Sequence, residues 1–408
     1  MPRPPKRPAR GPARTAAAGR RRGASPPRTV GDLLAAMEAV APSRLAESWD
    51  NVGLLLGSRA APCARVLLTI DLTPEVLDEA VDLAVDAVVA YHPPIFDPLK
   101  RLNGDDAKQR MLLEAAQAGI ALLSPHTALD AVQGGVNDWL AEGVAGGASE
   151  LARAALLEPL RPAAALPRGE AFKVVAFVPV EAGAAVRSAL ADAGAGQIGD
   201  YDHCTTRGDV TGTFRGGAST SPVVGTAGRL QEVREERIET VVSADRLPWA
   251  LAALRAVHPY EEPAFEVHAL APRPSLDEGA GRLLGLRAPA SVRTIAARLR
   301  KHLGCRRIEL AAAPGTRDAM HARIGICAGA GMSLFADARA RGATLFVTGE
   351  ARHHDQLAAV AGGCGLLLAG HTVTERGYLP RLAERLAAAC PGTMLTVSKA
   401  DAHPLSDA

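Results

Sequence analysis

Short apolar runs alternate with helical patterns along most of this 408-residue chain, and no other feature limits its fold as strongly. Apolar runs at 65–71, 87–91 and 120–124 are separated by amphipathic patterns at 74–83 and 107–118. Such alternation is typical of right-handed crossovers and a mostly parallel sheet. The same rhythm returns in the C-terminal part of the chain, so the sequence predicts an α/β fold with two lobes.

A different order of elements separates the two lobes. Residues 170–270 predict the order βαββαβ, which is the split βαβ pattern of ferredoxin-like folds. These elements are expected at 172–178, 182–193, 209–214, 237–243, 247–257 and 263–269. The expected domains are a basic tail (1–28), a first lobe (29–145), a linker rich in Ala, Gly and Pro (146–169), the insert (170–270) and a second lobe (271–408).

Histidines and carboxylates follow three of the apolar runs. His92 follows one run, His126 and Asp130 follow the next, and His371 and Glu375 follow a run near the C-terminus. Open α/β sheets hold their ligands at such strand ends. Imidazole with carboxylate suits zinc, manganese, iron, cobalt or nickel. Any one of these groups alone is better explained as a polar loop residue satisfied by water, but the three together predict a metal site.

Two further runs accompany the strand-end histidines, LAESWDNVGL at 45–54 and VTGEARHHD at 347–355. From about residue 29 to the C-terminus, the sequence resembles the GTP cyclohydrolase I type 2 homologues, also described as dinuclear-metal-centre hexameric proteins. The resemblance implies a two-lobed α/β subunit, a toroidal homohexamer and two divalent metal ions per subunit. It also implies that the insert is similar to nitrogen-regulatory PII and CutA proteins.

The resemblance further implies which residues bind the metals. They are His92, Asp130, His371 and Glu375, with Asp130 bridging the two ions. Many relatives have His-His where this chain has Tyr91-His92, so one expected imidazole is missing. A tyrosine is a poor ligand at pH 7 because its unperturbed pKa is about 10. Either Tyr91 coordinates as phenolate, or a histidine such as His126 substitutes, or one ion binds weakly.

A metal-dependent hydrolase acting on a nucleotide or phosphoester is the leading functional interpretation. Proton transfer is a candidate role for His126, His353 and His354. For His353 and His354, an equally good interpretation is a helix N-terminus that faces solvent. Arg376 either neutralises an anionic substrate or forms a structural salt bridge. The family name implies ring opening of GTP, although nothing in the residue spacing selects guanine. The alternative is a non-catalytic metal-binding hexamer with a storage, regulatory or scaffold role.

Three polar or glycine-rich segments are open to a functional and a structural interpretation. Trp49, Asp50 and Asn51 line the substrate pocket, or Trp49 belongs to the core. In the insert, the loop 258–262 and His203 bind a metal or small ligand, or form tight turns. The small-residue turn at 328–333 cradles an anion with its backbone N–H groups, or is tight because of close packing.

Charge and cysteine usage bear on compartment and partners. Residues 1–28 hold nine Lys/Arg and no acid, and we expect this tail to be disordered. Either the tail contacts nucleic acid or anionic lipid, or the true start of the protein lies near residue 29, where the family-like sequence begins. We favour the second interpretation. The six cysteines form no Cys-x-x-Cys pair, which argues against a zinc ribbon or a disulfide framework. Scattered thiols are typical of a reducing cytoplasm. We expect no membrane partner and no nucleic-acid partner.

Overall fold

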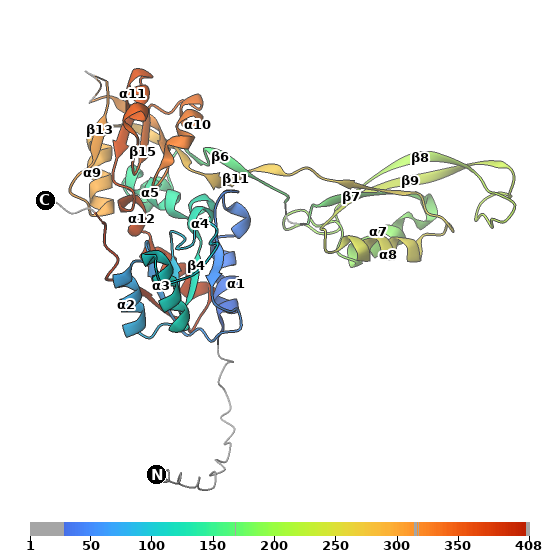
Figure 1. Ribbon diagram of the computed structural model, residues 1–408. Helices are drawn as coiled ribbons and strands as arrows, with labels where there is room; N and C mark the ends of the chain where they lie inside the picture. The colour runs from blue at the N-terminus through green and yellow to red at the C-terminus, as the bar shows by residue number, and fades with distance from the viewer. Residues whose placement is uncertain (1–27, 168, 314–315, 317, 405–408) are drawn as a thin grey trace, which may run out of the picture. The chain divides into compact units, whose positions relative to one another are not determined.

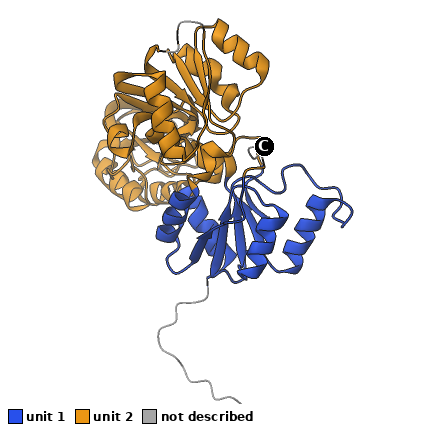
Figure 2. Cartoon of the chain, turned by 90° about the vertical axis from the view of Figure 1, so that its left-hand side faces the viewer, with its two compact units in different colours: residues 1–40, 51–125, 379–402 blue, residues 41–50, 126–378, 403–408 orange. Residues whose placement is uncertain are grey.

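The computed structural model describes residues 28–404 except 168, 314–315 and 317, so the expectations for the tail lie almost wholly outside the described residues. The chain forms two compact units, shown in separate colours in Figure 2. Unit 1 comprises residues 1–40, 51–125 and 379–402. Unit 2 comprises residues 41–50, 126–378 and 403–408.

Unit 1 is built on a five-stranded sheet in the order β1-β4-β3-β2-β17. The strands are β1 (Gly53–Leu56), β2 (Arg65–Thr69), β3 (Ala87–Ala90), β4 (Ala121–Ser124) and β17 (Met394–Val397). All are parallel except β1, which runs antiparallel to β4. The four residues of β3 are all buried, as expected for a parallel strand covered on both faces.

Helices cover the sheet of unit 1, and Figure 1 labels α1, α2 and α3. They are α1 (Val30–Val40), α2 (Pro74–Asp82), α3 (Ala107–Gln117) and α13 (Leu379–Ala389). Apolar residues of α2 and α3 share one core cluster with β2, β3 and β4. Helix α13 packs on β17 and β2, and α1 packs on α13.

Unit 2 contains a six-stranded sheet in the order β13-β16-β15-β14-β12-β5. Its parallel centre is β14 (Met320–Ile326), β15 (Leu345–Thr348) and β16 (Gly365–Leu368). The antiparallel strands are β5 (Leu156–Glu158), β12 (Arg282–Ser291) and β13 (Glu309–Ala311). Its helices include α4 (His126–Ala131), α5 (Val136–Ala145), α9 (Val292–Leu303), α10 (Phe335–Ala340), α11 (His353–Ala361) and α12 (Val373–Arg376).

The insert has the element order predicted from its pattern. Along the chain, its elements are β7 (Phe172–Pro179), α7 (Gly183–Asp192), β8 (Thr205–Arg215), β9 (Leu230–Val242), α8 (Leu247–Val257) and β10 (Phe265–Ala269). The antiparallel sheet has the order β10-β7-β9-β8, and α7 and α8 share a core with β7 and β9. The similarity of this insert to PII and CutA proteins stays a prediction.

The domain boundaries differ from those expected. The C-terminal strand β17 pairs with β2, so residues 379–402 belong to unit 1 and not to a second lobe ending the chain. Residues 126–145, expected in the first lobe, belong to unit 2. The expected linker contains β5 and also β6 (Arg161–Ala165), which pairs with β11 (Arg273–Ala280). These boundaries depend on the pairing of strands that lie far apart in the sequence, and such pairing cannot be predicted from local hydrophobic periodicity.

Within the part of the chain that the structure describes, no helix has the length and apolar character needed to cross a membrane.

Candidate metal centre

Two neighbouring strand ends in unit 1 hold a histidine against a carboxylate. Strands β2 and β3 run parallel, and Thr69 pairs with Ala90 in their register. The residues just beyond these positions therefore lie side by side. The Nδ1 atom of His92 lies 2.9 Å from Oδ1 of Asp71. A carboxylate at Nδ1 orients the ring and leaves Nε2 as the nitrogen suited to a metal ion.

Three neighbouring strand ends in unit 2 form an equivalent arrangement. The carboxyl ends of β14, β15 and β16 lead to Gly329, Glu350 and His371. Nδ1 of His371 lies 3.1 Å from Oε1 of Glu350. Its Nε2 lies 3.5 Å from Oε1 of Glu375, which is only 3% exposed. As predicted, His371 and Glu375 come together four residues apart, with His371 in the turn before the short helix α12.

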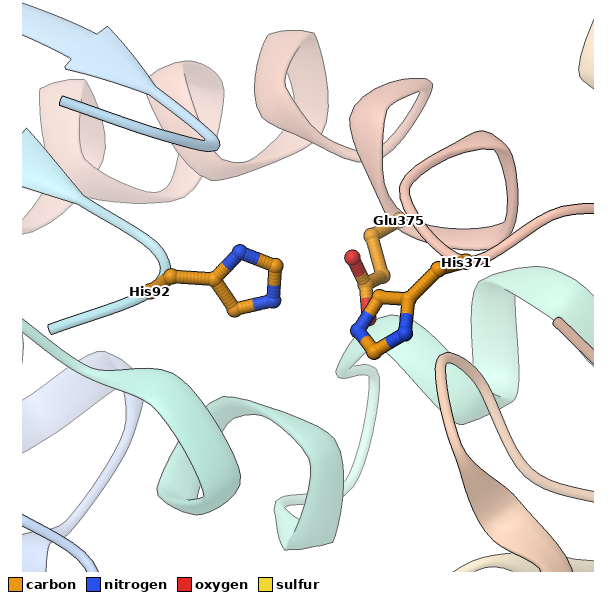
Figure 3. Close-up of side chains that lie close together, drawn as sticks. All are labelled: His92, His371 and Glu375. Carbon is orange, nitrogen blue, oxygen red and sulfur yellow. The ribbon is translucent and has the colours of Figure 1, made fainter. Parts of the chain in front are cut away.

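His92, His371 and Glu375 form one cluster, in which the ligand atoms all lie within 4.8 Å of one another. Figure 3 shows the three side chains pointing toward one another. Two imidazoles and one carboxylate are a donor set that zinc and other divalent transition metals accept. The cluster therefore brings together three of the four predicted ligands.

The backbone beside the cluster leaves room for these side chains. Gly329 has φ +60°, and a Cβ atom there would lie 2.6 Å from Oε1 of Glu375 and 3.1 Å from Nε2 of His371. The amide of Gly329 donates to the hydroxyl of Thr374, and the amide of Gly331 donates to the hydroxyl of Thr348. The turn at 328–333 is thus a close-packed turn, and these two amides are bound to protein hydroxyls. A glycine is required at position 329, because the backbone there has a positive φ and a Cβ atom would collide with Glu375.

Asp130 lies outside the three-residue cluster. It is near the end of α4, where its backbone carbonyl accepts a hydrogen bond from the side-chain amide of buried Asn137. The side-chain oxygen of Asn137 accepts a hydrogen bond from the amide of Ala328, which ties α4 to the turn beside Glu375. Burial raises the pKa of the Cys327 thiol, and the carboxylates of Asp130 and Glu375 raise it further. The charges of both carboxylates therefore act on the same thiol. The bridging role of Asp130 stays a prediction.

His126 forms a third carboxylate–histidine pair, with Asp50. Nδ1 of His126 lies 2.7 Å from Oδ1 of Asp50, and the ring lies edge-on to Trp49 with centroids 6.1 Å apart. The backbone of His126 has φ +29°, in the left-handed region that residues other than glycine rarely adopt. Thr127 donates to the second carboxylate oxygen of Asp50 through both its amide and its hydroxyl. His126 is thus held in one orientation at the start of α4.

Asp50 should make the fold more stable at neutral pH than in acid. Burial alone would raise its pKa, but hydrogen bonds from His126 and Thr127 outweigh burial and hold the pKa below the usual 3.8. A depressed pKa in the folded state gives stability that is present at neutral pH and is lost as pH falls through the folded pKa. We expect Asp50→Asn to lower the free energy of unfolding by about 1–3 kcal/mol at pH 7.

Urea unfolding at pH 7 and at pH 3 tests this expectation. The difference between Asp50→Asn and the wild type should shrink as the pH is lowered. An equal difference at both pH values would contradict the assignment of an ionised, hydrogen-bonded Asp50. Asp82→Asn is the matched control, since this carboxylate is exposed on α2.

The remaining predicted site residues lie outside the cluster. Tyr91 is buried, at 2% exposure, and its ring lies 5.1 Å from that of His92. His353 and His354 are both exposed at the N-terminus of α11, as the solvent-facing interpretation predicted. Arg376 is half-buried and donates to the hydroxyl of Thr372 one turn earlier. Trp49 is 59% exposed and therefore not a core residue.

The sequence analysis missed the carboxylates that orient the histidines. Asp71 and Glu350 were given no role, and Asp50 was considered only as a pocket residue. Asp71 and Glu350 each follow the end of a parallel strand, β2 and β15. Extending the strand-end argument from histidines to every carboxylate would have found both of them.

Comparison with known proteins gives a consistent result. Residues 28–404 match the family described as Duf34/NIF3 (NGG1p interacting factor 3). The chain is 36% identical over 325 residues to a protein of Mycobacterium tuberculosis called GTP cyclohydrolase 1 type 2 homolog, covering 80% of this chain and 82% of the relative. It is 30% identical over 376 residues to NIF3-like protein 1 of Bos taurus, covering 91% of each.

Solved structures show the same relationship. A Bacillus cereus protein related to NIF3 matches with a TM-score of 0.69 and 31% identity, covering 94% of this chain and all of that one. The Staphylococcus aureus protein SA1388 matches with a TM-score of 0.75 over 94% of this chain and all of its own. At 24% identity, this second likeness concerns the fold alone.

Proposed function

The chain belongs to the Duf34/NIF3 family, and we propose from its side chains that it is a metal-dependent hydrolase, with His92, His371 and Glu375 as metal ligands. The observation that carries the proposal is the cluster of these side chains, whose ligand atoms lie within 4.8 Å of one another. Both imidazoles have a carboxylate at Nδ1, which is the usual outer partner of a metal-binding histidine. The relatives named as GTP cyclohydrolase homologues make a nucleotide a reasonable substrate class.

A divalent ion held by these ligands supplies Lewis-acid activation of a water nucleophile and offsets negative charge on a phosphoester. The protein's own residues then have separate roles. Asp71 and Glu350 fix the rings of His92 and His371. His126, oriented through Nδ1 by Asp50, is the proposed acceptor of the water proton at Nε2.

Two cavities in unit 2 lie beside Glu350, and each is lined by one arginine and two carboxylates. They have volumes of about 510 and 290 Å³, and both are lined by Glu350 and Ala351. Arg352 lines the larger cavity and Arg307 lines the smaller one. Guanidinium groups bind phosphate oxygens in a bidentate way. Arg352 is therefore a candidate for substrate contact, whereas Arg307 is paired with Glu309 and the guanidinium of Arg376 donates to Thr372.

The finer points of the proposal are a second ion bridged by Asp130 and assembly as a homohexamer. Both are proposed from the resemblance of the sequence to the family alone. Light scattering coupled to size-exclusion chromatography measures the assembly directly. A cytoplasmic location stays a prediction.

A second candidate function is metal binding without catalysis, for storage, regulation or scaffolding. The observation that favours it is Tyr91, which occupies the position of an expected histidine and is buried. A site with one ligand fewer holds a second ion less firmly. Turnover measurements separate the two functions.

We expect steady-state hydrolysis of bis-p-nitrophenyl phosphate, p-nitrophenyl phosphate or GTP when manganese, zinc, iron, cobalt or nickel is supplied. Glu375→Gln should lower kcat by at least about 100-fold, because it removes a charged ligand while keeping the side-chain shape. His353→Ala is the matched control, since this exposed histidine lies outside the cluster, and it should keep wild-type turnover. Turnover that survives both chelation and Glu375→Gln would refute hydrolysis at this site. Metal binding without turnover of any of these substrates would favour the second function.

A further inference from the structure

The insert carries a cavity on the face of its sheet that its helices leave open. Ala176 and Ile238 pair across β7 and β9 and belong to the core shared with α7 and α8. Side chains alternate between the faces of a strand, so the neighbouring Phe177 lies on the opposite face. Phe177 and Glu235 both line a cavity of about 490 Å³. This volume is typical of small-molecule sites.

Apolar and aromatic side chains form most of the cavity wall. Phe177, Val210 and Phe214 contribute from the sheet, and Pro222 contributes from the loop between β8 and β9. The ring of Tyr260 lies 6.2 Å from that of Phe214, in a tilted arrangement. Such walls favour a ligand with an apolar or aromatic body.

The charged side chains that line the cavity are all carboxylates. Glu235 lines it although this residue is only 7% exposed, and Glu261 and Glu262 line its rim. Among the described residues, no lysine or arginine lines the cavity, and none forms an ion pair with these three glutamates. A buried carboxylate without a cationic partner in the protein favours a cation as its ligand.

The cavity is also held in shape before any ligand arrives. The hydroxyl of Tyr260 donates to Oε1 of Glu235 at 2.9 Å. Burial and the neighbouring Glu235 carboxylate raise the pKa of Tyr260, so the phenol stays a neutral donor. The amide of Ser221 donates to Glu261, which fixes the loop at the rim.

His258 takes part in this framework and is not a ligand. One ring nitrogen contacts the carbonyl of Phe177 at 2.9 Å, and the other accepts the amide of Tyr260. Both nitrogens are therefore engaged within the protein. His258 therefore has the structural role of a residue in a tight turn. Glu261 and Glu262, from the same loop, line the cavity.

We propose that this cavity binds a small organic cation, with an apolar or aromatic body against Phe177, Phe214 and Tyr260 and a protonated amine facing Glu235. The walls bury the body of the ligand, and the carboxylates select the positive charge and repel anions of the same shape. This site is separate from the proposed metal centre and does not depend on the hydrolase assignment.

Isothermal titration calorimetry on the full chain tests the proposal with matched pairs of probes. Phenethylamine and tryptamine are the cationic members, and 3-phenylpropionate and indole-3-propionate are their anionic counterparts. We expect the amines to bind at least tenfold more tightly than the anions, and added salt to weaken their binding. Failure of both amines to bind, or equal binding of amines and anions, would overturn the proposal.

Variants then locate the binding. Glu235→Gln should weaken amine binding at least tenfold, while Glu239→Gln, which changes a residue of the same strand paired with Lys173, should leave it unchanged. Circular dichroism melting establishes that each variant is folded. If Glu235→Gln does not fold, Glu262→Gln at the rim replaces it, with an expected loss of about threefold. Amine binding that is unaffected in the folded variant would overturn the proposal.

Discussion

His371→Ala should lower the affinity of the protein for zinc or manganese by more than about 100-fold. The reason is that it removes an imidazole whose Nε2 faces the buried carboxylate of Glu375. Glu350→Gln should have a smaller effect, about 10–100-fold, because Glu350 contacts only Nδ1 of His371. Competition titration against a fluorescent chelator measures both affinities.

The order of these two effects is the informative result. His354→Ala is the control, since this exposed histidine lies outside the cluster, and its affinity should equal that of the wild type. Equal affinities for His371→Ala and the wild type would remove His371 from the metal site. An effect of Glu350→Gln as large as that of His371→Ala would make Glu350 a direct ligand and not an orienting group.

Arg282→Met should destabilise unit 2 by about 3–5 kcal/mol, the largest stability effect that we expect. Arg282 is 1% exposed and forms an ion pair with Asp138. Its guanidinium also donates to the carbonyls of Gly279 and Gly281, and to those of Ala131 and Val132 at the end of α4. Without it, the Asp138 carboxylate is left buried without its cationic partner.

Urea unfolding followed by circular dichroism measures this loss. Arg307→Met, which breaks the exposed pair with Glu309, should cost less than about 1 kcal/mol. Adding Asp138→Leu to Arg282→Met should recover part of the stability, because the second change removes the uncompensated charge. If the double variant is less stable than Arg282→Met, the explanation based on an isolated buried charge is wrong.

Much of the fold followed from local pattern. The apolar runs became β2, β3 and β4, and the α/β fold class and the family assignment are confirmed. The pairing of β17 with β2 did not follow, because it joins segments that lie more than 300 residues apart in the chain.

The candidate site was predictable to a similar degree. A histidine directly after a parallel strand identified His92 and His371, because parallel strands end at one edge of a sheet. Glu375 followed from its spacing to His371. The need for glycine at 329 did not follow, because it depends on a contact with Glu375 across 46 residues of sequence. The strand-end argument would have placed Asp71 and Glu350 at the sheet edges, but their pairing with His92 and His371 depends on strand register, which periodicity alone does not provide.

We propose that His92, His371 and Glu375 hold a divalent ion. Elemental mass spectrometry of the wild-type protein, purified without a histidine tag, tests it most directly. We predict at least one transition-metal ion per subunit, removed by chelation and restored by added metal, and about two ions if Asp130 bridges a second site. Less than about 0.1 ion per subunit, with no uptake of zinc, manganese, iron, cobalt or nickel, would contradict the claim.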